Sequence, residues 1–385
     1  MSNLTNTSVS GIVEPLNTLT SFRFIAAFMV FLFHAGIWKE YQLGYLGVTF
    51  FFVLSGFILA YNYKEKFNTL EKPKLIYFYI ARIAKIYPIH FLTFFFAIPY
   101  YFLVPLNHPP LMYVFQGVTN ILLIQSFIPV GNVSFNGVSW SLSNELFFYV
   151  MFPFLLVLTI KFVKKVRTRI LLVVVLWVTF IVIFSLIPQA ADEGHSLSRW
   201  IAYFFPVTRL FDFFVGVIFG LVFSGIKNKV KNTSKFKFSF FEISSIVLSV
   251  VVIFYSPMFP QNLRYSLLIL PFWTILIFVF AFQKGILSRI ISNKVLIYLG
   301  EVSFSFYMIH NLVIIYAHII GFDFTSVVVI IGCLLTSIFL SMVMYRYYEE
   351  PMRKKMRLVL TEKYNKKLIN NKTKVDLVER TVTQT

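Results

Sequence analysis

The sequence predicts an all-α protein, a bundle of transmembrane helices that crosses a membrane about ten times. Of its 385 residues, 58% are apolar and only 13% are charged, whereas soluble proteins carry about 25% charged residues. Apolar runs long enough to span a bilayer recur from Thr20 to Tyr347. These runs are continuous and do not alternate with polar residues, which argues against a closed β-barrel.

Ten segments have the length and composition of a membrane-crossing helix. They cover residues 20–38, 44–61, 86–104, 138–160, 170–188, 201–224, 239–256, 265–283, 295–320 and 325–347. A polar N-terminal segment (1–19) precedes one transmembrane domain (20–350), and a basic tail (351–385) follows it. Small residues such as Gly47 and Gly56 favour close backbone contact around the second helix.

Lysine and arginine are distributed unequally among the connections between these helices. Segments 64–85, 161–169, 227–237 and 284–294, with the chain from Arg346 onward, hold 30 of the 35 basic residues. The positive-inside rule therefore predicts that these segments and both termini are cytoplasmic, in the inner membrane. The formal charge of +19 then reflects topology and attraction to anionic lipid, and nucleic-acid binding is not predicted.

The segment 111–128 does not fit a simple crossing. Under this topology the helix at 86–104 ends outside, and the helix at 138–160 must begin outside. We therefore predict that residues 111–128 re-enter the membrane or lie at its interface, where their backbone must border protein or water.

Two ionisable residues lie within the first apolar run. Eleven positions separate Arg23 from His34, so both side chains project from one helix face, about 16 Å apart along the axis. Ionisable groups at membrane depth face a protein interior or a wet cavity. Because histidine commonly takes a proton from a hydroxyl nucleophile, we predict that His34 is a general base on a polar stripe. The alternative is that Arg23 lies at the interface and His34 only ends the helix.

Arg82 and Lys85 form a second basic group. They are three residues apart and therefore lie on one side of a helical turn. Both are expected at the cytoplasmic side, near the depth of Arg23. Guanidinium and ammonium groups suit phosphates. The alternative is ordinary positive-inside anchoring, which we favour for the lysines of 64–74.

Glu145 lies near the start of the helix at 138–160, at the depth expected for His34. Its carboxylate is the second candidate catalytic group, which would orient the imidazole or bind an acceptor hydroxyl. Pairing with Arg209 is the alternative. Arg209 and Asp212 are three residues apart, and we expect them to neutralise each other for structural reasons.

Other classes of site lack support in the sequence. The histidines are scattered, so no metal site is predicted. The sequence contains no P-loop, GxGxxG motif or GxSxG nucleophile elbow, which leaves ATP-driven, nicotinamide-dependent and hydrolase functions without support.

Five motifs stand in order along the chain. They read LTSFRFIAAFMVFLFH, GYLGVTFFFVLSGF, ARIAKIYPIH, WSLSNELFFY and LGEVSFSFYMIH. Together, over about residues 19–351, they resemble the acyltransferase type 3 family of integral-membrane O-acyltransferases. Arg23 and His34 match that family's arginine-ten-residues-histidine motif, and Arg82 matches the first arginine of its RxxR motif. Lys85 replaces the second arginine, which keeps the charge and loses the bidentate geometry.

The resemblance implies that an acyl group, usually acetyl, passes from cytoplasmic acyl-CoA to a hydroxyl of an extracytoplasmic polysaccharide or glycolipid. A basic cytoplasmic mouth made by Arg23, Arg82 and Lys85 would bind the CoA phosphates. His34 would then take the proton of the acceptor hydroxyl as that hydroxyl attacks the thioester.

Four further residues are predicted to support this chemistry, namely Ser55, Trp140, Ser143 and His310. An acyl-enzyme intermediate on Ser55 or Ser143 is the alternative to direct transfer. A transporter or flippase for a glycan, lipid or small solute is the competing class of function, because charged residues within spans occur there too. A structural or sensory membrane protein would explain the spans but not the alignment of Arg23 with His34.

Overall fold

The computed structural model describes residues 14–67, 69–103, 109–188, 196–230 and 232–382, and every regular element in these residues is helical. The longer helices are α1 (Asn17–His34), α2 (Leu43–Tyr63), α3 (Lys72–Leu103), α4 (Pro110–Ile121), α5 (Trp140–Phe162), α6 (Val166–Leu186), α8 (Pro206–Ile226), α9 (Lys235–Tyr255), α11 (Leu270–Phe280), α13 (Lys294–Ile319), α14 (Val327–Met344) and α15 (Glu350–Val382). Three short helices are α7 (Leu197–Arg199), α10 (Gln261–Arg264) and α12 (Ile286–Ile291). The prediction of an all-α fold is confirmed.

In the described part of the chain, nine helices are long and apolar enough to cross a membrane. The crossing expected at 265–283 is instead the shorter helix α11, which begins at Leu270 with Pro271 in its first turn. Proline suits a first turn because its nitrogen has no hydrogen to leave unpaired. The irregular backbone before α11 is bonded to protein, since Trp177 Nε1 donates to the Leu267 carbonyl at 2.9 Å. Such bonds make non-helical backbone tolerable at membrane depth.

Helix α4 occupies most of the segment predicted to be re-entrant or interfacial. It has 12 residues and is therefore about 18 Å long, too short for a hydrocarbon core of about 30 Å. Its polar side chains Gln116 and Asn120 are buried, whereas Val114 and Val118 are exposed. This helix turns its polar face to protein and its apolar face outward, as the prediction for 111–128 requires.

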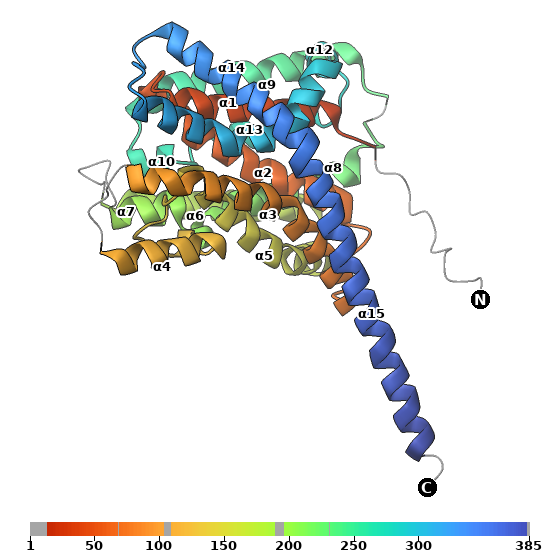
Figure 1. The fold of residues 1–385 in the computed structure, drawn as a ribbon. Coiled ribbons are helices and arrows are strands. Elements are labelled where there is room, and N and C mark those ends of the chain that lie inside the picture. Colours follow the sequence, from red (N-terminus) through yellow and green to blue (C-terminus); the bar gives the residue numbers. More distant parts are fainter. Residues whose placement is uncertain (1–13, 68, 104–108, 189–195, 231, 383–385) are drawn as a thin grey trace.

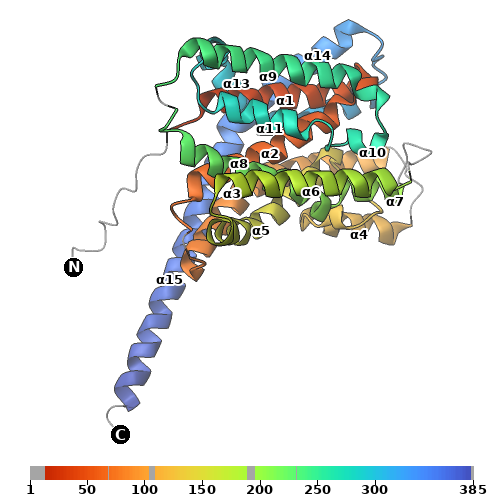
Figure 2. The same ribbon diagram turned by 180° about the vertical axis from the view of Figure 1, so that it is seen from behind.

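The bundle has two distinct ends (Figures 1 and 2). One end holds α12 and the start of α15, and the other holds α4, α7 and α10. The basic segment 284–294 and the chain from Arg346 therefore share one end, which we call the basic end. Helix α15 continues from that end away from the bundle (Figure 1). That the basic end faces the cytoplasm stays a prediction.

Helices α2 and α8 pack backbone against backbone through two glycines. A Cβ atom on Gly56 would lie 2.0 Å from the carbonyl oxygen of Phe213, and a Cβ on Gly216 would lie 2.0 Å from that of Val53. The predicted close approach at Gly56 is confirmed. This contact holds α2, which carries part of the site described below, against the centre of the bundle.

Replacing Gly56 by alanine is expected to destabilise the fold, because the nearest atom, the Phe213 carbonyl oxygen, belongs to the backbone and cannot rotate away. Overpacking of this kind costs about 1–3 kcal/mol, so the melting temperature of the protein in detergent should fall by several degrees. Gly225 on α8 is the matched control, since a Cβ there meets nothing within 4 Å. Equal melting temperatures for Gly56→Ala and Gly225→Ala would contradict the close contact.

Candidate functional site

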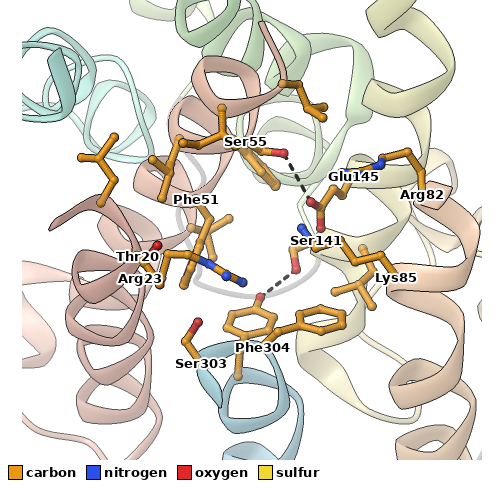
Figure 3. A pocket seen from close by; sticks show the side chains of 18 residues that line it. Thr20, Arg23, Phe51, Ser55, Arg82, Lys85, Ser141, Glu145, Ser303 and Phe304 are labelled. Atoms are coloured by element: carbon orange, nitrogen blue, oxygen red, sulfur yellow. Dashed lines mark hydrogen bonds between the residues drawn. The ribbon is translucent and has the colours of Figure 1, made fainter. Parts of the chain in front are cut away.

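A cavity of about 180 Å³ lies among α1, α2, α3, α5 and α13. Arg23 from α1 and Arg82 and Lys85 from α3 line its wall, and we call it the arginine cavity. Figure 3 shows these side chains around one space, with Glu145 from α5 and Ser55 from α2 opposite Arg23. The structure therefore brings together the three residues that the sequence suggested for binding an anion.

The positive charges of this cavity are only partly balanced. Within the described residues, none of the three cations forms a salt bridge. Glu145 and Glu349 act electrostatically on Lys85 from a longer range, and Glu349 also acts on Arg23. Three cations against two carboxylates leave a net positive charge, which favours an anionic ligand.

Aromatic rings surround the Arg82 guanidinium. Its Cζ atom lies 5.8, 5.7 and 5.6 Å from the ring centroids of Tyr63, Phe78 and Tyr149. Cation–π contacts of this kind hold the planar group in place. Its Nε is buried and has no hydrogen-bond partner in the described part of the protein. A buried donor without an acceptor costs free energy, and an oxygen of a bound anion would supply the acceptor.

Glu145 lies in the arginine cavity and does not contact His34. Its Oε1 accepts hydrogen bonds from Ser55 Oγ at 3.3 Å and from the Tyr149 hydroxyl. Tyr149 lies one turn further along α5, and Ser55 comes from α2, so the carboxylate ties these two helices together. The structure thus places Glu145 with the cations and gives His34 a different partner.

A second cavity, of about 160 Å³, contains His34 in its wall, and we call it the histidine cavity. Aromatic and polar side chains form the rest of the lining, among them Tyr45, Trp140, Tyr203 and Asn311. The Nδ1 atom of His34 lies 2.9 Å from Nε2 of His310 on α13. In the described part of the chain, no protein group is hydrogen-bonded to His34 Nε2.

The pairing of His34 with His310 was missed by the sequence analysis, although a signal for it exists. His34 lies 14 residues into segment 20–38, and His310 lies 15 residues into segment 295–320. Both segments start at the same side in the predicted topology, so the two rings have the same depth. Depth alone does not show which helices are neighbours. In the structure, α1 and α13 pack against each other.

The two cavities adjoin. Val48 and Tyr307 line both of them. The Tyr307 hydroxyl lies 2.8 Å from Ser141 Oγ and donates to the Val138 carbonyl at 3.1 Å. The predicted polar stripe from Arg23 to His34 stays a prediction: Arg23 lines one of these adjoining cavities and His34 lines the other.

The remaining predicted residues occupy different places. Trp140 lines the histidine cavity. Ser143 is fully buried, and its Oγ accepts from the Ser126 amide at 3.4 Å, so it has a structural bond of its own. Arg209 and Asp212 form a buried salt bridge at 3.1 Å, which confirms their structural pairing. Among the described residues no group of three or more His, Cys, Asp or Glu side chains is arranged to hold a metal ion.

These features define a multi-pass membrane protein with a cationic cavity beside a histidine-lined one. Residues 16–346 match the family described as "Acyltransferase domain". This match covers most of the chain, and the protein belongs to that family. It is a membrane acyltransferase, as the resemblance implied.

Named relatives agree with this assignment. The acyltransferase MdmB of Streptomyces mycarofaciens is 29% identical over 335 residues, which are 80% of this chain and 81% of that protein. Proteins named as putative O-acetyltransferases in Staphylococcus aureus strains COL and N315 are 26% identical over 358 residues, 87% of this chain. The match spans 57% of the length of these staphylococcal relatives. No solved structure matches the chain.

Proposed function

We propose that this protein transfers an acyl group, acetyl in the first instance, from acyl-CoA to a hydroxyl of a cell-surface polysaccharide or glycolipid. The observation that carries the proposal is a cavity with three cations that form no salt bridge with any described residue, adjoining a second cavity lined by His34. The printed names of the staphylococcal relatives support O-acetyl transfer. The proposed location is the inner membrane, with the basic end and both termini in the cytoplasm.

The donor would bind at the arginine cavity. Arg23 and Arg82 would hold phosphate oxygens of CoA through charge-assisted hydrogen bonds. Lys85, whose charge is balanced in part by Glu145 and Glu349, would contribute less. Glu145 would hold the cavity wall through Ser55 and Tyr149 and would not orient the imidazole.

The acceptor would bind at the histidine cavity, which lies toward the end opposite the basic one. Aromatic faces with a few polar groups are typical of pockets for small ligands, and Trp140, Tyr203 and Asn311 supply them. A sugar hydroxyl placed near Nε2 of His34 would be within reach of a general base.

The reaction would proceed by direct transfer. The hydroxyl oxygen attacks the thioester carbon, an O–C bond forms and the C–S bond breaks. His34 Nε2 takes the hydroxyl proton and returns it to the leaving CoA sulfur, so that the ester and free CoA are the products. Because Val48 and Tyr307 line both cavities, the thioester would pass these two side chains on its way to His34.

Binding of CoA to the purified protein in detergent tests the donor half of this proposal. We expect titration calorimetry to detect CoA binding. A Lys74→Ala variant should bind equally well, because Lys74 is exposed and paired with Glu71 outside the cavity. A solute transporter without an acyl donor should bind no CoA.

The acceptor half is tested by NMR of surface glycans and glycolipids from cells with and without the gene. Loss of O-acetyl signals in the cells without it would give the reaction and the acceptor together. An unchanged spectrum, together with absent CoA binding, would reject the function and favour a transporter.

A further inference from the structure

The hydrogen bonds of His310 determine which of its ring nitrogens carries the proton. His310 is fully buried, and its Nδ1 lies 3.1 Å from the carbonyl oxygen of Phe306, one turn earlier on α13. A carbonyl only accepts, so His310 Nδ1 is the donor. A buried imidazolium without a carboxylate partner is costly, and His310 has no salt bridge in the described part of the chain. His310 is therefore neutral, and its Nε2 keeps a lone pair.

The same reasoning determines which ring nitrogen of His34 carries the proton. Its Nδ1 lies 2.9 Å from His310 Nε2. Because that nitrogen carries a lone pair and no proton, His34 Nδ1 must be the donor. A neutral imidazole has one N–H group, and Nε2 of His34 consequently carries the lone pair. This is the nitrogen without a partner on a ring that lines the histidine cavity.

We infer that His310 is a positioning residue, which fixes His34 in the tautomer whose Nε2 is ready to take a proton. The inference rests on the proposed function and adds to it the group that orients the base. After proton transfer, the Nδ1–H of His34 still donates to His310, which stabilises the new imidazolium. A buried acid has this role in serine protease triads, and here a neutral imidazole has it.

The packing of α1 against α13 supports such a fixed pair. A Cβ on Gly300 would lie 2.0 Å from the carbonyl oxygen of Thr20, so the two helices touch through their backbones. The His310 ring is stacked on Phe306, with centroids 5.7 Å apart, and meets the edge of Phe31 at 6.3 Å. The ring has little freedom to turn away from His34.

Two substitutions at His310 separate positioning from packing. His310→Leu removes the acceptor, and His310→Gln keeps an acceptor oxygen at a similar reach. Mutation of a partner that orients a functional histidine in a metal site typically lowers metal affinity or activity about 10–100-fold. We expect a fall of that size in kcat for His310→Leu, with little change in KM for acetyl-CoA. His310→Gln should recover most of the loss.

His318 provides the matched control. It lies on the same helix, and its Nδ1 bonds to the carbonyl of Ile314 one turn earlier at 3.0 Å, but none of the other described histidines contacts it. His318→Leu should leave kcat unchanged. If His310→Leu matches wild type, or if His310→Gln loses as much activity as His310→Leu, the positioning role is wrong.

NMR of protein carrying ring-¹⁵N histidine gives a readout that does not need activity. The His34 resonances, assigned by their loss in a His34 variant, should show a protonated Nδ1 in wild type. In His310→Leu, the proton should be distributed between Nδ1 and Nε2 of His34. The hydrogen bond to His310, which fixes one tautomer in the wild type, is absent from this variant. A protonated Nε2 in wild-type His34 would overturn the inference. Absence of acyl transfer by wild type would instead reject the proposed function.

Discussion

Replacing His34 by alanine is expected to lower the rate of acyl transfer about 10²–10⁴-fold, the usual contribution of a positioned general base. In the proposed mechanism Nε2 of His34 accepts the hydroxyl proton, and alanine at this position of the histidine cavity would leave no imidazole to do so. The measurement is the initial rate of acetyl incorporation by purified protein, with the glycan or glycolipid that NMR identifies.

The same variant should still bind the donor. His34 does not line the arginine cavity, so the Kd for CoA should stay within about twofold, well below the tenfold change that 1.4 kcal/mol produces. A normal melting temperature in detergent would show that the fold is intact. Undiminished acylation by a folded His34→Ala protein would reject the role of His34. Loss of CoA binding would mean that the two cavities are not separate donor and acceptor sites.

The sequence predicts the placement of groups along one helix well. The spacing of Arg82 and Lys85 implies a common face, and both side chains line one cavity with Arg23. Helical periodicity fixes these relations, because it depends on one element and on nothing around it. The short polar-faced helix at α4 is likewise implied by topology and length.

Relations between helices are predicted less well. Glu145 was expected beside His34 because of its depth, yet it lies with the cations, bonded to Ser55 and Tyr149. Depth is one coordinate, and the lateral order of helices is set by backbone contacts such as that of Gly300 with Thr20. The presence of Tyr307 in the walls of both cavities has the same origin, since it comes from a helix distant in sequence from α1.

Removing the charges of Arg23 and Arg82 is expected to have the second large effect, on donor affinity. A hydrogen bond to a charged group contributes about 1.5–3 kcal/mol, so Arg23→Gln or Arg82→Gln should weaken CoA binding by roughly 10- to 150-fold. The loss of CoA affinity in the double variant should be smaller than the product of the two single-variant losses, because both residues line one cavity and share a ligand. Lys85→Gln should have the smallest effect, since Glu145 and Glu349 already act on its charge.

Comparison of CoA with pantetheine, which lacks the phosphates, identifies what the arginines bind. Wild-type protein should prefer CoA, and the preference should weaken as salt is added, because phosphate–arginine attraction is screened. In Arg23→Gln and Arg82→Gln, affinity for CoA should fall toward that for pantetheine, while affinity for pantetheine stays unchanged. If both ligands weaken equally, the arginines support the cavity wall and do not hold phosphate. The anion site would then have to lie elsewhere on the basic end, and the arginine cavity would lose its role as the entry for acyl-CoA.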